Sequence, residues 1–162
     1  MTKRQRITCT MLMVALLPTT LSCNRAEELP GATAAQNRSA DETAIRAQIA
    51  ANEAAGNKRD FEGVAATYAA DGDLMRLAGP RVIGRAAIRQ MIKEALATTP
   101  ATSQNTFTIE TIRFVAQDVA IVETTLHFSE GPLREERGTL VMLRQDGTWP
   151  IAAARVLPAQ QR

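Results

Sequence analysis

The part of the chain that most constrains its fold is a succession of strand patterns at 107–156. Apolar and polar residues alternate over 107–115 and again over 139–143, and this period of two is typical of half-buried β-strands. Asp146 and Gly147 stand between two such runs, where the dipeptide indicates a tight hairpin because both central residues of that turn need a positive φ. We therefore predict a meander of four antiparallel strands, at 107–115, 119–129, 137–145 and 148–156.

Three helical patterns and two short strands precede the meander. Ser39 and Glu42 have the spacing of a capping box, which opens a helix, and Gly56 is suited to end it. The next pattern begins near Asp60 and includes Tyr68 at helical spacing. The predicted helices are 41–55, 60–71 and 85–96, and the predicted short strands are 73–77 and 81–83.

This order of elements argues against an alternating β–α–β arrangement and therefore against a parallel sheet. We predict the α+β class, with an antiparallel sheet curved around three N-terminal helices. The length of 162 residues suits one domain.

The first 23 residues have the three parts of a secretory signal. A basic start is followed by an apolar run at 7–17, which is shorter than the roughly 20 residues of a membrane-spanning helix. Ser22 and Cys23 resemble the end of a bacterial lipobox, which implies that Cys23 is lipidated; the alternative is an ordinary cleaved signal in which the cysteine is incidental. Asn24 stands where a signal for inner-membrane retention would have Asp. In a Gram-negative host the expected location is therefore the outer membrane, facing the periplasm.

The sequence after the cysteine divides into a tether and a domain. Residues 25–38 are polar and small and have no periodicity, which is typical of a flexible linker. The predicted organisation is a signal peptide at 1–22, the lipidated cysteine and tether at 23–38, a domain at 39–158 and a tail at 159–162. Membrane contact would come from acyl chains on the cysteine.

Charge and cysteine content exclude several classes of function. Removing the signal leaves 16 of the 19 basic residues against 17 acidic residues, so no basic surface is expected for a nucleic acid. Cys9 lies inside the signal, so the domain has no thiol for catalysis or a disulfide. A single histidine cannot build a metal centre of the His/Cys type, and no glycine-rich phosphate loop indicates a nucleotide cofactor. We expect neither a metal nor a cofactor.

Three segments together resemble a known superfamily. Residues 61–73 are similar to the second-helix-to-strand segment of the nuclear transport factor 2-like proteins, residues 84–88 to the start of the third helix, and residues 146–151 to the closing hairpin. Within that superfamily the chain looks most like SnoaL-like proteins of the SgcJ/EcaC type, over residues 41–158. Pro150 departs from the pattern, and we expect its nitrogen to face an edge or a bulge.

The resemblance implies a cone-shaped, cystatin-like fold whose curved sheet and helices enclose a pocket. Members of the superfamily use the pocket as ketosteroid isomerases, polyketide cyclases, dehydratases or binding modules, and dimers are common among them. The fold does not choose among these functions.

The isomerase mechanism is not expected here. It needs an aspartate base together with an oxyanion hole, and the position matching that base is Arg76. Because arginine stays protonated, it does not abstract a proton. Asp71 and Asp73 are interpreted as capping residues at a helix-to-strand turn.

His127 is the only histidine, and alternation places it on the same strand face as Glu123. If that face is concave, the two side chains form a base and its orienter; otherwise the histidine is an ordinary exposed residue. The sequence does not tell which face is concave.

The remaining candidates each have a structural and a functional interpretation. Tyr68 either donates its hydroxyl to a ligand or packs in the core, and Trp149 is expected in the core. Arg155 either pairs with a ligand carboxylate or with an acidic side chain, and the charged run at 133–137 is interpreted as a solvated hairpin end. The candidates for the pocket are Tyr68, Arg76, Glu123, His127, Trp149 and Arg155.

Three functions follow from these observations. The leading one is a lipid-anchored domain that binds a small apolar or amphipathic molecule in the pocket. The alternatives are an enzyme of isomerase, cyclase or dehydratase type without the usual aspartate, and a protein that acts by forming a homodimer through its open sheet face.

Overall fold

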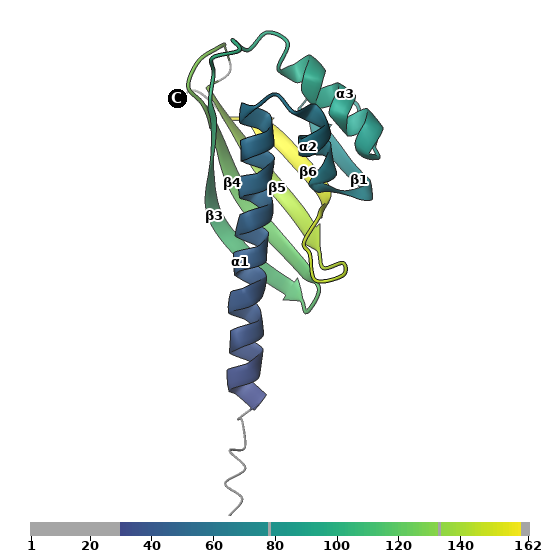
Figure 1. Cartoon of the computed structure of the whole chain (residues 1–162), viewed down its shortest axis with the longest axis vertical. Coiled ribbons are helices and arrows are strands. Elements are labelled where there is room, and N and C mark those ends of the chain that lie inside the picture. The colour runs from purple at the N-terminus through teal and green to yellow at the C-terminus, as the bar shows by residue number, and fades with distance from the viewer. Residues whose placement is uncertain (1–29, 78, 133, 160–162) are drawn as a thin grey trace, which may run out of the picture.

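The computed structural model of the chain describes residues 30–77, 79–132 and 134–159. These residues form three helices and six strands, with the helices on one side of a curved sheet (Figure 1). In chain order the elements are α1 Pro30–Asn57, α2 Phe61–Ala66, β1 Tyr68–Arg76, β2 Val82–Ile83, α3 Arg85–Ala95, β3 Asn105–Ala116, β4 Val119–Phe128, β5 Glu135–Leu143 and β6 Ile151–Pro158.

The sheet has the order β2-β1-β6-β5-β4-β3. Strands β3 to β6 are antiparallel neighbours, which confirms the predicted meander and the α+β class. Strand β1 pairs with β6 in parallel, so the sheet is mixed and the expectation of a purely antiparallel sheet is wrong. The reason is that strand periodicity reports which face is buried but not which edge a distant strand will join.

Helix α1 is longer than predicted. It begins at Pro30, where the missing N–H of proline is tolerated, and Figure 1 shows its first turns extending past the edge of the sheet. The predicted start at Asp41 is wrong, because Ser39 lies inside the helix and its carbonyl accepts a hydrogen bond from Thr43 Oγ1 at 2.9 Å. Residues 30–38 of the predicted tether are therefore helical, whereas the signal, Cys23 and the rest of the tether lie outside the described residues.

The inner side of α1 is fixed by Ile45 and Ile49, which are one turn apart and buried. They pack in a core with side chains from α3 and the sheet, among them Ile88, Val122, Met142 and Trp149. Within the part of the chain that the structure describes, no helix combines the length and the apolar character that a bilayer span requires.

Helix α2 is shorter than predicted. Asp60 caps it as expected, accepting the Gly63 N–H at 2.9 Å, but the helix ends at Ala66 and Tyr68 already belongs to β1. The Thr67 hydroxyl donates to the Val64 carbonyl at 2.7 Å at this end. Consequently Asp71 and Asp73 are strand residues, and their interpretation as caps is wrong.

The strand begins early because β1 has to follow the backbone of β6 closely. A side chain at Gly72 would place its Cβ 2.8 Å from the Ile151 carbonyl oxygen, and the register of the two strands shifts between Tyr68 and Asp73. This close approach of two segments far apart in the sequence is not visible in the helical spacing of 61–68.

A register shift also divides β3. It lies between Ile109 and Thr111, and beyond it Ile112 and Phe114 pack on the core. The prediction that alternate residues from 107 to 115 share one face therefore holds only as far as Ile109.

The hairpin prediction is confirmed, since Asp146 and Gly147 have φ values of 49° and 77°. Pro150 lies just before β6, next to a register shift between β5 and β6.

Candidate functional site

A cavity of about 90 Å³ lies between the helices and the concave face of the sheet. Its wall is mainly aliphatic and aromatic. It is lined by Ile49, Asn52, Gly56, Val64, Tyr68, Leu74, Arg76, Ile92, Ala95, Leu96, Asn105, Phe107, Thr124, Leu126, Phe128, Glu136, Gly138, Leu140, Ile151 and Val156. One water molecule needs roughly 10–15 Å³, so the space is several times larger than a single water requires.

The space lies over a row of paired residues in the sheet that includes a glycine. In this row Arg76 pairs with Val156, Val156 with Gly138, and Gly138 with Thr124. A Cβ atom at Gly138 would lie 2.7 Å from Thr124 Oγ1. Glycine at this position therefore leaves the space that the Thr124 side chain occupies on the neighbouring strand. The glycine leaves room on the concave face that a larger residue would fill.

The cavity contains a partly buried ion pair between Arg76 on β1 and Glu136 on β5. The two residues reach each other across β6, and Arg76 Nη2 donates to Glu136 Oε1. The glutamate side chain is 3% exposed and the arginine side chain 26%. The second carboxylate oxygen, Oε2, is buried and has no hydrogen-bond partner among the described residues.

Burial raises the pKa of Glu136 above its ordinary range, and the Arg76 guanidinium acts in the opposite direction. A buried polar atom that lacks a partner is unfavourable, and such atoms are rare in native proteins. The Oε2 atom is therefore the feature of this cavity that most needs a ligand group.

Sequence reasoning did not identify Glu136. It falls in the charged run 133–137, and the prediction that this run is solvated is wrong for this residue. The available signal was alternation, because Glu136, Gly138, Leu140 and Met142 are spaced by two and all four are buried. A charged residue that alternation places on the same strand face as the core residues is a candidate functional residue.

Tyr68 lines the same cavity from the start of β1. Burial raises the pKa of the Tyr68 hydroxyl well above its ordinary value, with smaller and opposing contributions from Arg76 and Asp73. The phenol is therefore neutral and able to donate a hydrogen bond. Asn52 and Thr124 add polar atoms to the wall, and Asn52 is held by donation to Thr67 Oγ1 at 2.8 Å.

His127 and Glu123 lie on the opposite face of the sheet. On β4 the residues that line the cavity are Thr124, Leu126 and Phe128, so their neighbours along the strand face outward. The His127 side chain is 47% exposed, with Nδ1 3.5 Å from Glu135 Oε2. Glu123 accepts a hydrogen bond from Thr139 Oγ1 at 2.8 Å. The hypothesis of a base and its orienter inside the cone is therefore wrong.

Arg155 also faces away from the cavity, and it pairs with an acidic side chain. Asp73 is buried between Arg155 and Arg81, and Arg81 Nη2 lies 2.7 Å from Asp73 Oδ2. The hydrogen bond from Arg81 is the largest cause that lowers the pKa of Asp73, and Arg155 acts in the same direction against the effect of burial. The cluster joins β1 and β6 on the convex face.

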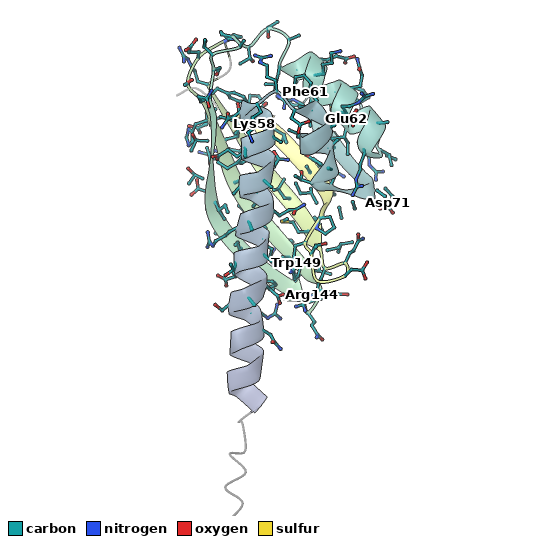
Figure 2. The ribbon with its side chains drawn as sticks, viewed as in Figure 1. Lys58, Phe61, Glu62, Asp71, Arg144 and Trp149 are labelled. Carbon is teal, nitrogen blue, oxygen red and sulfur yellow. The ribbon has the colours of Figure 1, made fainter. Side chains whose placement is uncertain are left out.

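Trp149 belongs to the core, as expected, and it does not line the cavity, so its place among the pocket candidates is wrong. It is 1% exposed, and its ring packs edge-on against Phe114 with centroids 5.7 Å apart. The indole Nε1 donates to Asp41 Oδ1 at 3.2 Å. Arg144 pairs with the same aspartate and lies over the indole ring, and Figure 2 shows Arg144 and Trp149 together beside α1.

A second depression, of about 360 Å³, lies against α2 and α3. Its wall is largely charged and includes Glu62 and Arg89, which form an ion pair at 2.7 Å between exposed side chains. Figure 2 shows Phe61 and Glu62 on α2 at this end of the molecule. Among the described residues, no three His, Cys, Asp or Glu side chains gather as metal ligands would.

Comparison with known proteins identifies the family. The model of the protein family described as "SnoaL-like domain" matches residues 49–150 of the chain. No curated protein matches the chain.

The solved structures that resemble the chain share its fold. A nuclear transport factor 2-like protein with a cystatin-like fold from Novosphingobium aromaticivorans has a TM-score of 0.67 and 18% identity, over 85% of this chain and 94% of its own. A ketosteroid isomerase-like protein from Erwinia carotovora atroseptica has a TM-score of 0.62 and 19% identity, over 74% and 96%. A putative scytalone dehydratase from N. aromaticivorans has a TM-score of 0.65 and 16% identity, over 78% and 90%. The chain thus has the cystatin-like, nuclear transport factor 2-like fold that its sequence predicts.

Proposed function

Because the chain belongs to the SnoaL-like domain family, we propose that its cone cavity binds a small, largely apolar molecule. The observation that carries this proposal is the cavity itself, which is mainly aliphatic and aromatic and contains few polar groups, as ligand sites do. The larger core side chains do not fill it, since Met142 and Trp149 are buried elsewhere in the core and Met75 is 40% exposed.

The test is native mass spectrometry of the purified protein, looking for a co-purified ligand. Val156→Phe fills the cavity, so we expect this variant to lose the ligand. Leu157→Phe changes the next residue of β6, whose side chain is 52% exposed, and should retain it. A ligand that stays bound to the Val156→Phe variant would contradict the proposal.

A second candidate is an enzyme that moves a proton, of isomerase, cyclase or dehydratase type. It is favoured by one observation, that the Glu136 carboxylate and the neutral Tyr68 hydroxyl line the same cavity. A carboxylate with a raised pKa is suited to general-base catalysis. Exchange of the α-hydrogens of cyclohexanone in D₂O, followed by NMR, tests this directly. A rate that Glu136→Gln leaves unchanged would exclude Glu136 as the base.

The place of action that we propose is the bacterial cell envelope, with the chain anchored through a lipidated Cys23. The support is the basic start, the short apolar run and the Ser22-Cys23 ending of the first 23 residues. Cys23→Ser should abolish the incorporation of labelled palmitate and release the protein from the membrane fraction. Unchanged labelling and fractionation would refute the anchor and, with it, the expected outer-membrane location.

A homodimer is a third proposal, and it is supported by exposed apolar side chains. Met75 and Leu157 lie on the outward face of the neighbouring strands β1 and β6, and Leu77 directly follows β1. The three side chains are 40–62% exposed. Light scattering after gel filtration should give twice the chain mass, and Leu157→Glu should give the chain mass alone. A wild-type protein that is monomeric at high concentration would overturn this proposal.

A further inference from the structure

We propose that Glu136 Oε2 recognises the ligand, by accepting a hydrogen bond from the hydroxyl group of an uncharged, largely apolar alcohol. This inference rests on the proposed function, because it names the chemical class of the molecule that the same cavity binds. It assigns the acceptor to one atom, and that assignment predicts how ligands of equal shape will differ in affinity.

The position of the carboxylate supports the choice of this atom. Glu136 is 3% exposed, and Oε1 is already used by Arg76. Oε2 is buried, belongs to a residue that lines the cavity, and has no partner among the residues that the structure describes. Since an unpaired buried acceptor is unfavourable, a ligand that donates to Oε2 gains the bond and removes the unfavourable state.

The ion pair decides whether this atom accepts or donates. Arg76 presents only N–H donors, so its hydrogen bond requires an acceptor at Oε1, and its positive charge favours the ionised carboxylate against the effect of burial. An ionised carboxylate has acceptor sites on both oxygens. The ligand group at Oε2 is therefore a donor, and a ketone or an ether of the same shape would leave Oε2 unpaired.

The charges of the cavity favour an uncharged ligand. Among the described residues that line the cavity, Arg76 carries the one positive charge and Glu136 the one negative charge, and the two compensate each other. Burial keeps Tyr68 neutral. A carboxylate on the ligand would face Oε2 and be repelled by it, and an ammonium group would be buried among aliphatic side chains such as Leu126 and Val156. A hydroxyl group on an apolar skeleton meets both conditions.

The experiment compares two probes of nearly the same shape. Cyclohexanol can donate a hydrogen bond, whereas cyclohexanone can only accept one. Dissociation constants for both are measured by ligand-observed NMR on the full-length protein. Because hydrogen bonds to charged groups are the stronger ones, we expect cyclohexanol to bind about tenfold more tightly than cyclohexanone.

A variant reverses the preference if the assignment is right. In Glu136→Gln the side-chain carbonyl is expected to stay with Arg76, which turns the amide N–H₂ toward the cavity and makes it a donor. Cyclohexanone should then bind at least as tightly as cyclohexanol. The matched control is Glu135→Gln, one residue earlier on β5, where the side chain faces outward toward His127; it should keep the wild-type preference.

The outcomes separate the two proposals. A preference for the alcohol in the wild type that is lost in Glu136→Gln supports both. Equal binding of the two probes, or tighter binding of the ketone, in the wild type overturns the assignment of Oε2 but leaves the binding function standing. Binding of neither probe overturns both proposals at this ligand size. The wild-type comparison decides by itself if the variant does not fold.

Discussion

At the scale of single residues, the cavity contains a carboxylate, that of Glu136, whose burial reduces the stability of the fold. The pKa of Glu136 is raised, and the leading cause is burial, so the ionised carboxylate is less favourable in the fold than in the unfolded chain. Functional residues are commonly placed where they reduce stability. Glu136 should therefore behave differently from an acidic residue that is part of a stabilising ion pair.

We expect Glu136→Gln to be more stable than the wild type at pH 7. Because the folded pKa of Glu136 is raised, its contribution to stability is fully present below the ordinary value of about 4.5 and is lost as the pH rises through the folded value. The variant mimics the protonated form at every pH. Its unfolding temperature should be higher by about 2–5 °C at pH 7 and equal to that of the wild type at pH 4. A variant less stable at both pH values would show that the ion pair stabilises the fold.

Asp73 should give the opposite dependence. Its pKa is lowered, chiefly by the hydrogen bond from Arg81, so its contribution is present above the ordinary value of about 3.8 and is lost as the pH falls through the folded value. Asp73→Asn should lower the free energy of unfolding by about 1 kcal/mol at pH 7, and the difference should vanish near pH 2. Urea unfolding at both pH values measures it, with the exposed Asp71→Asn as control. A difference that persists at pH 2 would mean that the charge of Asp73 is not its cause.

The same residues show what the sequence could reveal about the site. Tyr68 and Arg76 were predicted pocket residues and line the cavity, and a period-two reading of β5 would have added Glu136. The pairing of Glu136 with Arg76 could not be predicted, since it depends on β1 joining the free edge of β6. For His127 and Glu123 the sequence defined a shared face, but the direction of curvature decided that this face is the outer one.

At the scale of elements, Asp41 joins α1 to the connection between β5 and β6. Asp41 accepts the indole N–H of Trp149 and pairs with Arg144, and both partners lie in the connection between β5 and β6. The helices could be predicted from apolar spacing and Asp60. The end of α2 and the register shift in β3 could not be predicted, because both are set by backbone contacts with other strands.

Asp41→Ala should detach this end of the helix. The change leaves the buried Trp149 N–H without an acceptor and Arg144 without its carboxylate, so we expect a loss of about 2–3 kcal/mol in the free energy of unfolding. Denaturant unfolding followed by the fluorescence of the single tryptophan measures it. Glu42→Ala, the next residue on the helix, is the control and should change stability by less than about 0.5 kcal/mol. Equal effects of the two changes would refute the role of Asp41.

At the scale of the whole molecule, the fold has a compact part and a projecting helix end. Arg38 is the first residue on α1 with a described side-chain contact to the sheet, its guanidinium lying 4.3 Å from the Phe114 ring centre. Ile45 and Ile49, farther along, are buried in the core. The boundary of the folded unit therefore falls near Arg38, and the helix continues beyond it.

Two truncations test this boundary. Removal of residues 1–37 should change the unfolding temperature by less than about 3 °C, because the core and the contacts of Asp41 remain. Removal of residues 1–46 deletes Asp41 and Ile45 and should prevent cooperative unfolding. Calorimetric scans of both forms give the answer. A large loss of stability in the shorter truncation would place the start of the folded unit before Arg38.

The parallel pairing of β1 with β6 has a consequence for how the protein is made. In the sheet, β6 is the strand that separates β1 from β5, yet it is the last of the described strands in chain order. While a ribosome is still synthesising the protein, the helices with β1 and β2 have no strand that joins them to β3–β5. The two parts of the sheet can join only once β6 has been synthesised, so the parallel pairing of β1 with β6 is a late, non-local step in the folding of this domain.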